Sequence, residues 1–156
     1  MKKFITILIA LITIVAVAQA QKPIAIGDVF KGKPVLDVAK EHAVEAFDET
    51  KVIYKIGMTE DEFVNQCLNA FPVKYKALRD VYVPYAKYLY SFHKRGFTDD
   101  QLTKAVTGKE FVDCANGVIA WRKANPGIIP ETDSWWRKLI HWIAVVSVWL
   151  DETLPQ

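Results

Sequence analysis

The sequence predicts an all-α fold: a single-domain bundle of five or six helices, preceded by an irregular arm. Two observations carry this prediction. Apolar residues recur at intervals of three and four through most of the chain after residue 34, as they do on one face of an α-helix. One helix-junction pattern also occurs twice, 39 residues apart. We therefore interpret residues 1–20 as a cleaved signal peptide, residues 21–33 as an extended arm and residues 34–156 as the helical domain.

The first twenty residues have the pattern of a bacterial export signal. Lys2 and Lys3 give a positive start, residues 4–17 are apolar apart from two threonines, and residues 18–20 (Ala-Gln-Ala) match the small-x-small site of a signal peptidase. An uncleaved membrane anchor is the alternative, but the apolar run is shorter than the ~20 residues of a full span. We expect cleavage near Ala20 and a periplasmic or secreted protein.

The charge balance argues against a nucleic-acid partner. The whole chain has 20 lysines and arginines against 18 aspartates and glutamates. Two of those lysines belong to the expected signal peptide, which leaves 18 against 18 in the mature chain. A neutral chain lacks the basic surface that binds phosphate backbones, so we expect no nucleic acid among the partners.

Cys67 and Cys114, the two cysteines of the chain, are predicted to form a disulfide. Each falls on the apolar face of an expected helix, and disulfides persist outside the cytoplasm. Closing a loop of about 48 residues would stabilise the fold by about 4 kcal/mol in the chain-entropy model. Two buried free thiols are the alternative. A catalytic thiol would need a histidine partner, and the three histidines are scattered in the sequence.

A first amphipathic helix is expected from Pro34 to Ile56. Proline suits the first turn of a helix, where its missing N–H costs no hydrogen bond. Apolar residues then recur three or four positions apart, with one wider gap. Gly57 predicts the end of this helix, because glycine readily takes the left-handed conformation that closes a helix.

The repeated junction pattern predicts where two further helices begin. Its copies are Gly57-Met58-Thr59 with Glu62 and Gly96-Phe97-Thr98 with Gln101. In each copy a glycine can end one helix, and the threonine two residues later can cap the next. The Glu or Gln three residues after the threonine completes a capping box. We expect two consecutive αα-hairpins.

A long helix is expected from about Tyr75 to Arg95, with a kink at Pro84. Most of its aromatic residues share one face and are interpreted as core. Tyr88 and Tyr90 fall off that face, so they are the better candidates in this helix for an exposed contact with a partner or a membrane.

Another helix is expected after Gly108 and before the Asn-Pro-Gly sequence at 125–127. Gly117 in its middle either weakens it or allows close packing of a neighbouring helix.

A last helix is expected from about Thr132 to Leu150. It carries four of the five tryptophans, and its second half is apolar nearly all round. Such a helix lies in a core, against a partner or at a lipid interface, and it is too short to span a membrane. Its candidate contacts to a partner or a membrane are Trp135, Trp136, Arg137, Lys138, Trp142 and Trp149.

The sequence has no nucleotide-binding glycine loop, nucleophile elbow, zincin helix or Cys/His cluster with metal spacing. We therefore expect no catalytic residues, no metal and no cofactor. The leading hypothesis is a non-enzymatic binding protein of the cell envelope, of the inhibitor, immunity or adaptor kind, whose partner is another envelope protein. The alternatives are a membrane-surface protein anchored by the Trp-rich helix, and an envelope hydrolase.

Overall fold

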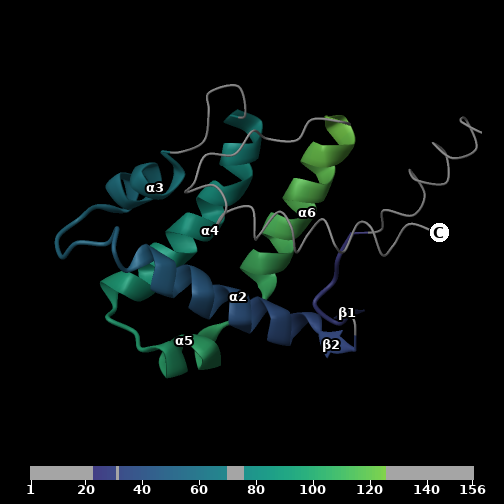
Figure 1. The fold of residues 1–156 in the computed structure, drawn as a ribbon, viewed down its shortest axis with the longest axis horizontal. Coiled ribbons are helices and arrows are strands. Elements are labelled where there is room, and N and C mark those ends of the chain that lie inside the picture. The colour runs from purple at the N-terminus through teal and green to yellow at the C-terminus, as the bar shows by residue number, and fades with distance from the viewer. Residues whose placement is uncertain (1–22, 31, 70–75, 126–156) are drawn as a thin grey trace, which may run out of the picture.

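The computed structural model describes residues 23–30, 32–69 and 76–125 (Figure 1). Within these residues the chain is mostly helical, which confirms the all-α prediction. The helices are α2 (Val35–Thr50), α3 (Glu60–Leu68), α4 (Lys76–Lys94), α5 (Asp99–Ala105) and α6 (Lys109–Ala124). The expected signal peptide and the expected Trp-rich helix lie outside the described residues.

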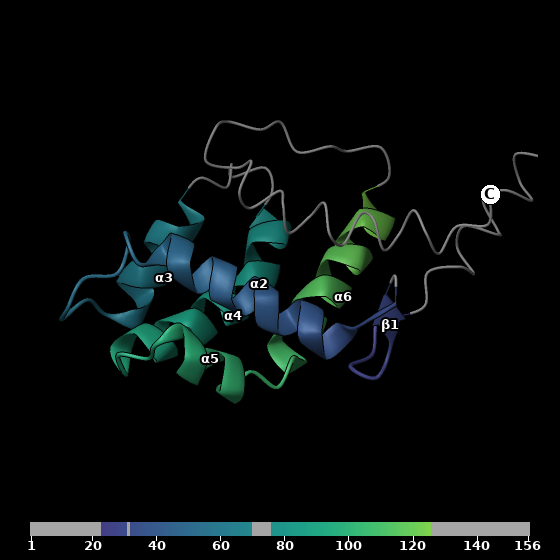
Figure 2. The same ribbon diagram turned by 60° about the horizontal axis from the view of Figure 1, so that its bottom comes forward.

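Helix α4 is the centre of the arrangement. It packs against α3 on one side and α6 on the other, and α2 crosses both α4 and α6 (Figures 1 and 2). Helix α5 packs mainly against α2, which is distant from it in sequence. The Gly-Thr junctions connect α2 to α3 and α4 to α5. The two helices of each such pair pack chiefly on other helices and not on each other, unlike the consecutive hairpins that the sequence predicts.

The core lies where these helices meet, and its largest fully buried side chains are Phe63, Phe92, Leu78, Leu102, Val35 and Val118. Gly117 of α6 lies directly against Val81 of α4. A Cβ atom on this glycine would be 2.6 Å from Val81 Cγ1, which is closer than two carbon atoms can pack. Of the two interpretations of Gly117, the close approach of a neighbouring helix is therefore confirmed.

The expected N-terminal arm is packed against the helices. It contains an antiparallel ribbon of β1 (Val29–Phe30) and β2 (Lys33–Pro34). Ahead of the ribbon, Ile24 is buried and both of its backbone groups bond to Asn116 of α6. The Ile24 N–H donates to Asn116 Oδ1 at 2.7 Å, and Asn116 Nδ2 donates to the Ile24 carbonyl at 2.9 Å. One asparagine thus fixes the arm to α6.

Both predicted capping boxes are present. At the start of α3, the Glu62 N–H donates to Thr59 Oγ1 at 3.3 Å and the Thr59 N–H donates to Glu62 Oε2 at 2.8 Å. At the start of α5, Thr98 and Gln101 exchange the same two bonds, at 3.3 and 2.9 Å. Each box satisfies backbone N–H groups that a helix start leaves without intrahelical partners.

The second junction ends α4 as predicted. Gly96 has φ 65°, its N–H donates to the His93 carbonyl at 3.0 Å, and the Phe97 N–H donates to the Phe92 carbonyl at 3.2 Å. This pair of bonds is a Schellman motif, and the contact between the Phe92 and Phe97 rings, with centroids 5.1 Å apart, is its usual apolar companion.

The first junction does not end a helix, and there the prediction is wrong. Helix α2 stops at Thr50, six residues before Ile56. Gly57 has φ 88° but lies in a turn, in which the Met58 N–H donates to the Lys55 carbonyl at 3.0 Å. The residues from 51 to 58 therefore form a loop between α2 and α3, which we call the α2–α3 loop.

Helix α4 matches the predicted range closely and is continuous through Pro84, which is exposed. Because proline has no N–H, the Asp80 carbonyl one turn earlier has no intrahelical partner, and on this exposed side of the helix water can bond to it instead.

Candidate functional site

The α2–α3 loop presents two apolar side chains to solvent. Val52 is 85% exposed and Ile56 is 98% exposed. The loop projects beyond the helices at one end of the molecule (Figures 1 and 2). Among the described residues, the other large exposed apolar side chains are Ile26 and Val29, in the N-terminal arm, and both are less exposed. We therefore take this loop as the candidate contact surface among the described residues.

The inward side of this loop is anchored in the core. The Tyr54 ring stacks on His93 with centroids 5.1 Å apart and meets Phe63 edge to face at 6.2 Å. The Met58 carbonyl accepts a hydrogen bond of 2.8 Å from the Tyr90 hydroxyl. The core therefore holds the loop at Tyr54 and Met58, while Val52 and Ile56 are exposed. Because the loop is fixed at these two points, its conformation is already ordered before any partner binds.

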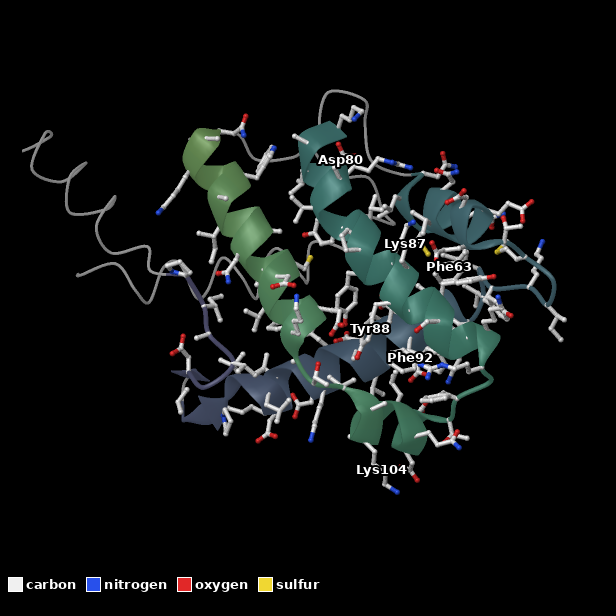
Figure 3. All side chains as sticks on the ribbon, turned by 180° about the vertical axis from the view of Figure 1, so that it is seen from behind. Phe63, Asp80, Lys87, Tyr88, Phe92 and Lys104 are labelled. Atoms are coloured by element: carbon white, nitrogen blue, oxygen red, sulfur yellow. The ribbon has the colours of Figure 1, made fainter. Side chains whose placement is uncertain are left out.

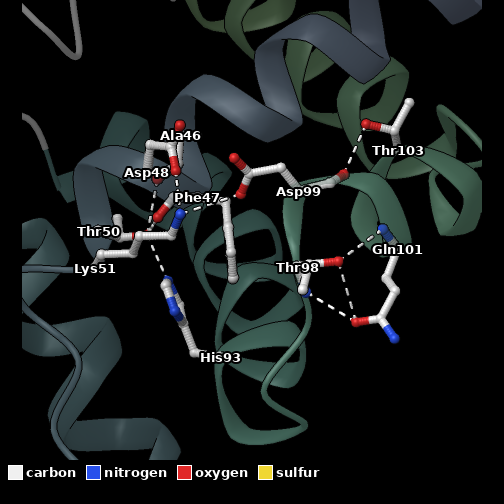
Figure 4. Close-up of polar contacts among 10 residues, drawn as sticks. All are labelled: Ala46, Phe47, Asp48, Thr50, Lys51, His93, Thr98, Asp99, Gln101 and Thr103. Atoms are coloured by element: carbon white, nitrogen blue, oxygen red, sulfur yellow. Dashed lines mark hydrogen bonds and ion pairs between the residues drawn. The ribbon is translucent and has the colours of Figure 1, made fainter.

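His93 of α4 is the centre of the cluster that anchors the loop. It is 8% exposed, and its ring stacks on Phe47 at 4.1 Å as well as on Tyr54. Its Nε2 lies 2.8 Å from Thr50 Oγ1, which also lies 2.8 Å from the Ala46 carbonyl (Figure 4). The tautomer with hydrogen on Nε2 satisfies both contacts, because the Thr50 hydroxyl can then donate its proton to Ala46. Burial and the nearby Lys51 charge lower the pKa of His93 to about 4, so the ring is neutral at neutral pH.

Lys51 fastens the base of the loop to α5. Its ammonium group forms an ion pair with Asp48 of α2 and another, at 3.1 Å, with Asp99 of α5 (Figure 4). Hydrogen bonds to these two carboxylates raise the pKa of Lys51. The side chain is about half exposed, so this link contributes little stability, but it places two carboxylates next to the loop.

The predicted disulfide is absent. Cys67 and Cys114 are both free thiols, one on α3 and the other on α6, and both are buried. Helix α4 packs against each of these two helices and lies between them (Figure 1). Burial raises the pKa of both thiols to about 12, so neither forms the thiolate that nucleophilic chemistry needs. The structure thus agrees with the alternative of two buried free thiols.

The expectation that Tyr90 is exposed is wrong, because only 8% of this residue is exposed and its hydroxyl bonds to Met58. Tyr88 is half-buried on the side of α4 that faces α6 (Figure 3). Burial and the Glu110 charge on α6 raise the pKa of Tyr88 to about 12. The Tyr88 hydroxyl and Glu110 Oε2 are buried without a hydrogen-bond partner among the described residues. Neither tyrosine offers the open ring face that we expected.

The candidate contacts of the Trp-rich helix cannot be placed with this loop, because Trp135, Trp136, Arg137, Lys138, Trp142 and Trp149 lie outside the described residues.

The α2–α3 loop was missed by sequence reasoning, which assigned Val52 and Ile56 to a helix. Nothing between Phe47 and Gly57 is a helix breaker, and the one available signal is the wider gap in the apolar spacing between Phe47 and Ile53. The importance of His93 was missed for a similar reason: a solitary histidine shows its role only when the fold brings rings from α2, α3 and the loop around it.

Within the part of the chain that the structure describes, no helix is both long and apolar enough to cross a membrane. The same residues bring together no group of three His, Cys, Asp or Glu side chains that could hold a metal ion. Comparison of the chain with protein-family models, curated proteins and solved structures found no match.

Proposed function

We propose that this chain is an exported, non-enzymatic binding protein of the bacterial cell envelope, and that it binds another envelope protein through the α2–α3 loop. The observation that carries the proposal is the exposure of Val52 and Ile56 on a loop whose inner residues are held by the core. A loop that is already ordered loses little conformational entropy when it docks, so its two aliphatic side chains can contribute most of their burial energy to binding.

The export signal in residues 1–20 supports the location in the envelope. We also infer that the Trp-rich segment from 132 to 150 forms the last helix of the bundle, because its apolar surface needs a cover. In this proposal that segment completes the domain, while the α2–α3 loop makes the contact.

Site-specific photo-crosslinking in living bacteria tests the proposal. The photoreactive residue p-benzoylphenylalanine replaces Val52 or Ile56, and a matched control places it at Lys104, which is exposed on α5 (Figure 3). We expect a discrete adduct with one protein from both loop positions and none from position 104. No adduct from the loop, or the same adducts from all three positions, would contradict the proposal.

A second measurement asks whether the apolar contact drives binding. With the probe at position 52, Ile56→Ser removes the more exposed aliphatic side chain. Burying such a side chain contributes about 1.5 kcal/mol or more, so the adduct yield should fall about tenfold. An unchanged yield would mean that the loop lies near the partner without contributing to the contact.

A further inference from the structure

Helix α2 meets α4 and α6 near one end of the α4–α6 pair. It contacts the last turn of α4, where Phe47 stacks on His93, and the start of α6, where His42 stacks on Phe111. Both α4 and α6 continue past α2 (Figures 1 and 2). The other end of the pair comprises the first half of α4 and the second half of α6.

That other end has fully buried apolar side chains. Val81, in the first half of α4, lies against Gly117, in the second half of α6. Leu78 and Val118 stand beside this contact, and they are 0% and 1% exposed. Val118 follows Phe111 by seven residues, which is two turns along the face of α6 that meets α2. Because α3, α4 and α6 lie side by side in one layer, burial on this face requires a second layer beside α2.

One segment of the chain outside the described residues is long enough to supply that layer. Once the expected signal peptide is removed, the segments outside are 21–22, 31, 70–75 and 126–156. Residues 70–75 are six in number and join α3 to α4, so they cannot also extend over α6. The layer must therefore come from residues 126–156.

The expected Trp-rich helix in this segment has an apolar face of the right kind. Its apolar residues recur at alternating intervals of four and three, so they share one face of a helix. They are Trp135, Leu139, Trp142, Val146 and Trp149. The expected start at Thr132 follows the end of α6 at Ala124 by eight positions. Such a short connection brings the chain back at the end of the α4–α6 pair where Leu78 and Val118 are buried.

We propose that residues 132–150 form a helix that lies beside α2 across α4 and α6, with its tryptophan face over Leu78 and Val118. This inference extends the part of the proposed function in which the segment completes the domain, and it does not depend on the contact made by the α2–α3 loop. It assigns the tryptophans to a contact within the chain, so they are not available to a membrane or to a partner protein.

Photo-crosslinking within the purified, full-length mature protein tests the inference. p-Benzoylphenylalanine replaces Trp142, and the matched control places it at Ala144, two positions along and on the opposite side of the expected helix. Mass spectrometry of the digested protein identifies the crosslinked peptides, and equal thermal unfolding shows that both variants are folded. The probe at Trp135, on the same face as Trp142, keeps the test decisive if replacement of Trp142 prevents folding.

We expect position 142 to crosslink to residues 76–85 of α4 or 115–124 of α6 within one chain, and position 144 to give neither crosslink. Crosslinks from position 142 to other parts of the chain, equal crosslinks from both positions, or no crosslink would overturn the inference. An adduct of twice the chain's mass would assign the tryptophan face to a second copy. Sedimentation of the wild-type protein with phosphatidylglycerol vesicles would assign it to a lipid surface.

These outcomes leave the contact of the α2–α3 loop untouched, because the purified protein contains no partner. Crosslinking from positions 52 and 56 in living bacteria tests that contact separately, so the two proposals fail independently.

Discussion

The two helix junctions of this protein begin with the same residues and differ in what precedes them. At the second junction α4 continues to Lys94, and Gly96 closes it within two residues through a Schellman motif. At the first, α2 ends at Thr50 and the chain makes a loop before it reaches Gly57. Both then enter the next helix through a complete capping box. The shared pattern therefore determines how a helix begins, while its glycine ends a helix only where the preceding residues remain helical.

The difference has a functional consequence. The compact junction packs its apolar residue against the core, since the half-buried Phe97 ring contacts Phe92. The extended junction, which is the α2–α3 loop, contacts the core through Tyr54 and Met58. It leaves Val52 and Ile56 exposed. Four predictions test this contrast, in order of decreasing effect on stability.

The largest effect is expected from Phe92→Ala. Phe92 is fully buried and supplies the apolar contact of the compact junction. Truncating a buried phenylalanine costs about 3–5 kcal/mol, which is a large part of a typical domain's free energy of unfolding. Urea unfolding measures the loss of free energy of unfolding. A loss below about 1 kcal/mol would show that the Phe92 contacts at the compact junction contribute little to the stability of the fold.

The anchor of the extended junction should make stability depend on pH. Because the pKa of His93 falls from 6.5 to about 4 on folding, the unfolded chain takes up the proton first as the pH is lowered. The contribution of neutral His93 is complete above pH 6.5 and is lost between pH 6.5 and about 4, by at most about 3 kcal/mol. His93→Phe keeps the stacked ring without the titration, so its stability should fall less over this range. Equal losses in wild type and variant, measured by urea unfolding, would contradict the assignment.

The two capping boxes should respond differently to acid, because only the first contains a titrating side chain. Thr59→Ala and Thr98→Ala should each cost about 1 kcal/mol. The Thr59 hydrogen bonds lower the pKa of Glu62, so the charged form stabilises the first box. That contribution is present above the ordinary pKa of 4.5 and is lost as the pH falls through the lowered value. The second box contains Gln101 and has no such dependence. Amide hydrogen exchange at the starts of α3 and α5 distinguishes them, and Glu62→Gln should make the two boxes alike.

The smallest effect on stability is expected from Val52→Ser and Ile56→Ser. Both side chains are exposed, so each substitution should change the free energy of unfolding by less than about 0.5 kcal/mol. Tyr54→Ser in the same loop serves as the contrast, because it removes a ring that stacks on His93. If all three substitutions lower the free energy of unfolding by the same amount, Tyr54 does not anchor the loop to the core.

The sequence by itself determined the helical class, the two helix starts with their capping boxes, and the glycine that ends α4. These features depend on residues within a few positions of one another, so the local pattern contains them. Only the tertiary structure decided that α2 stops at Thr50, that Cys67 and Cys114 stay apart as thiols, and that α5 packs on α2. Each of these depends on partners from elsewhere in the chain. His93 approaches Thr50 from α4, and its ring provides the surface on which Tyr54 turns inward and leaves Val52 and Ile56 exposed.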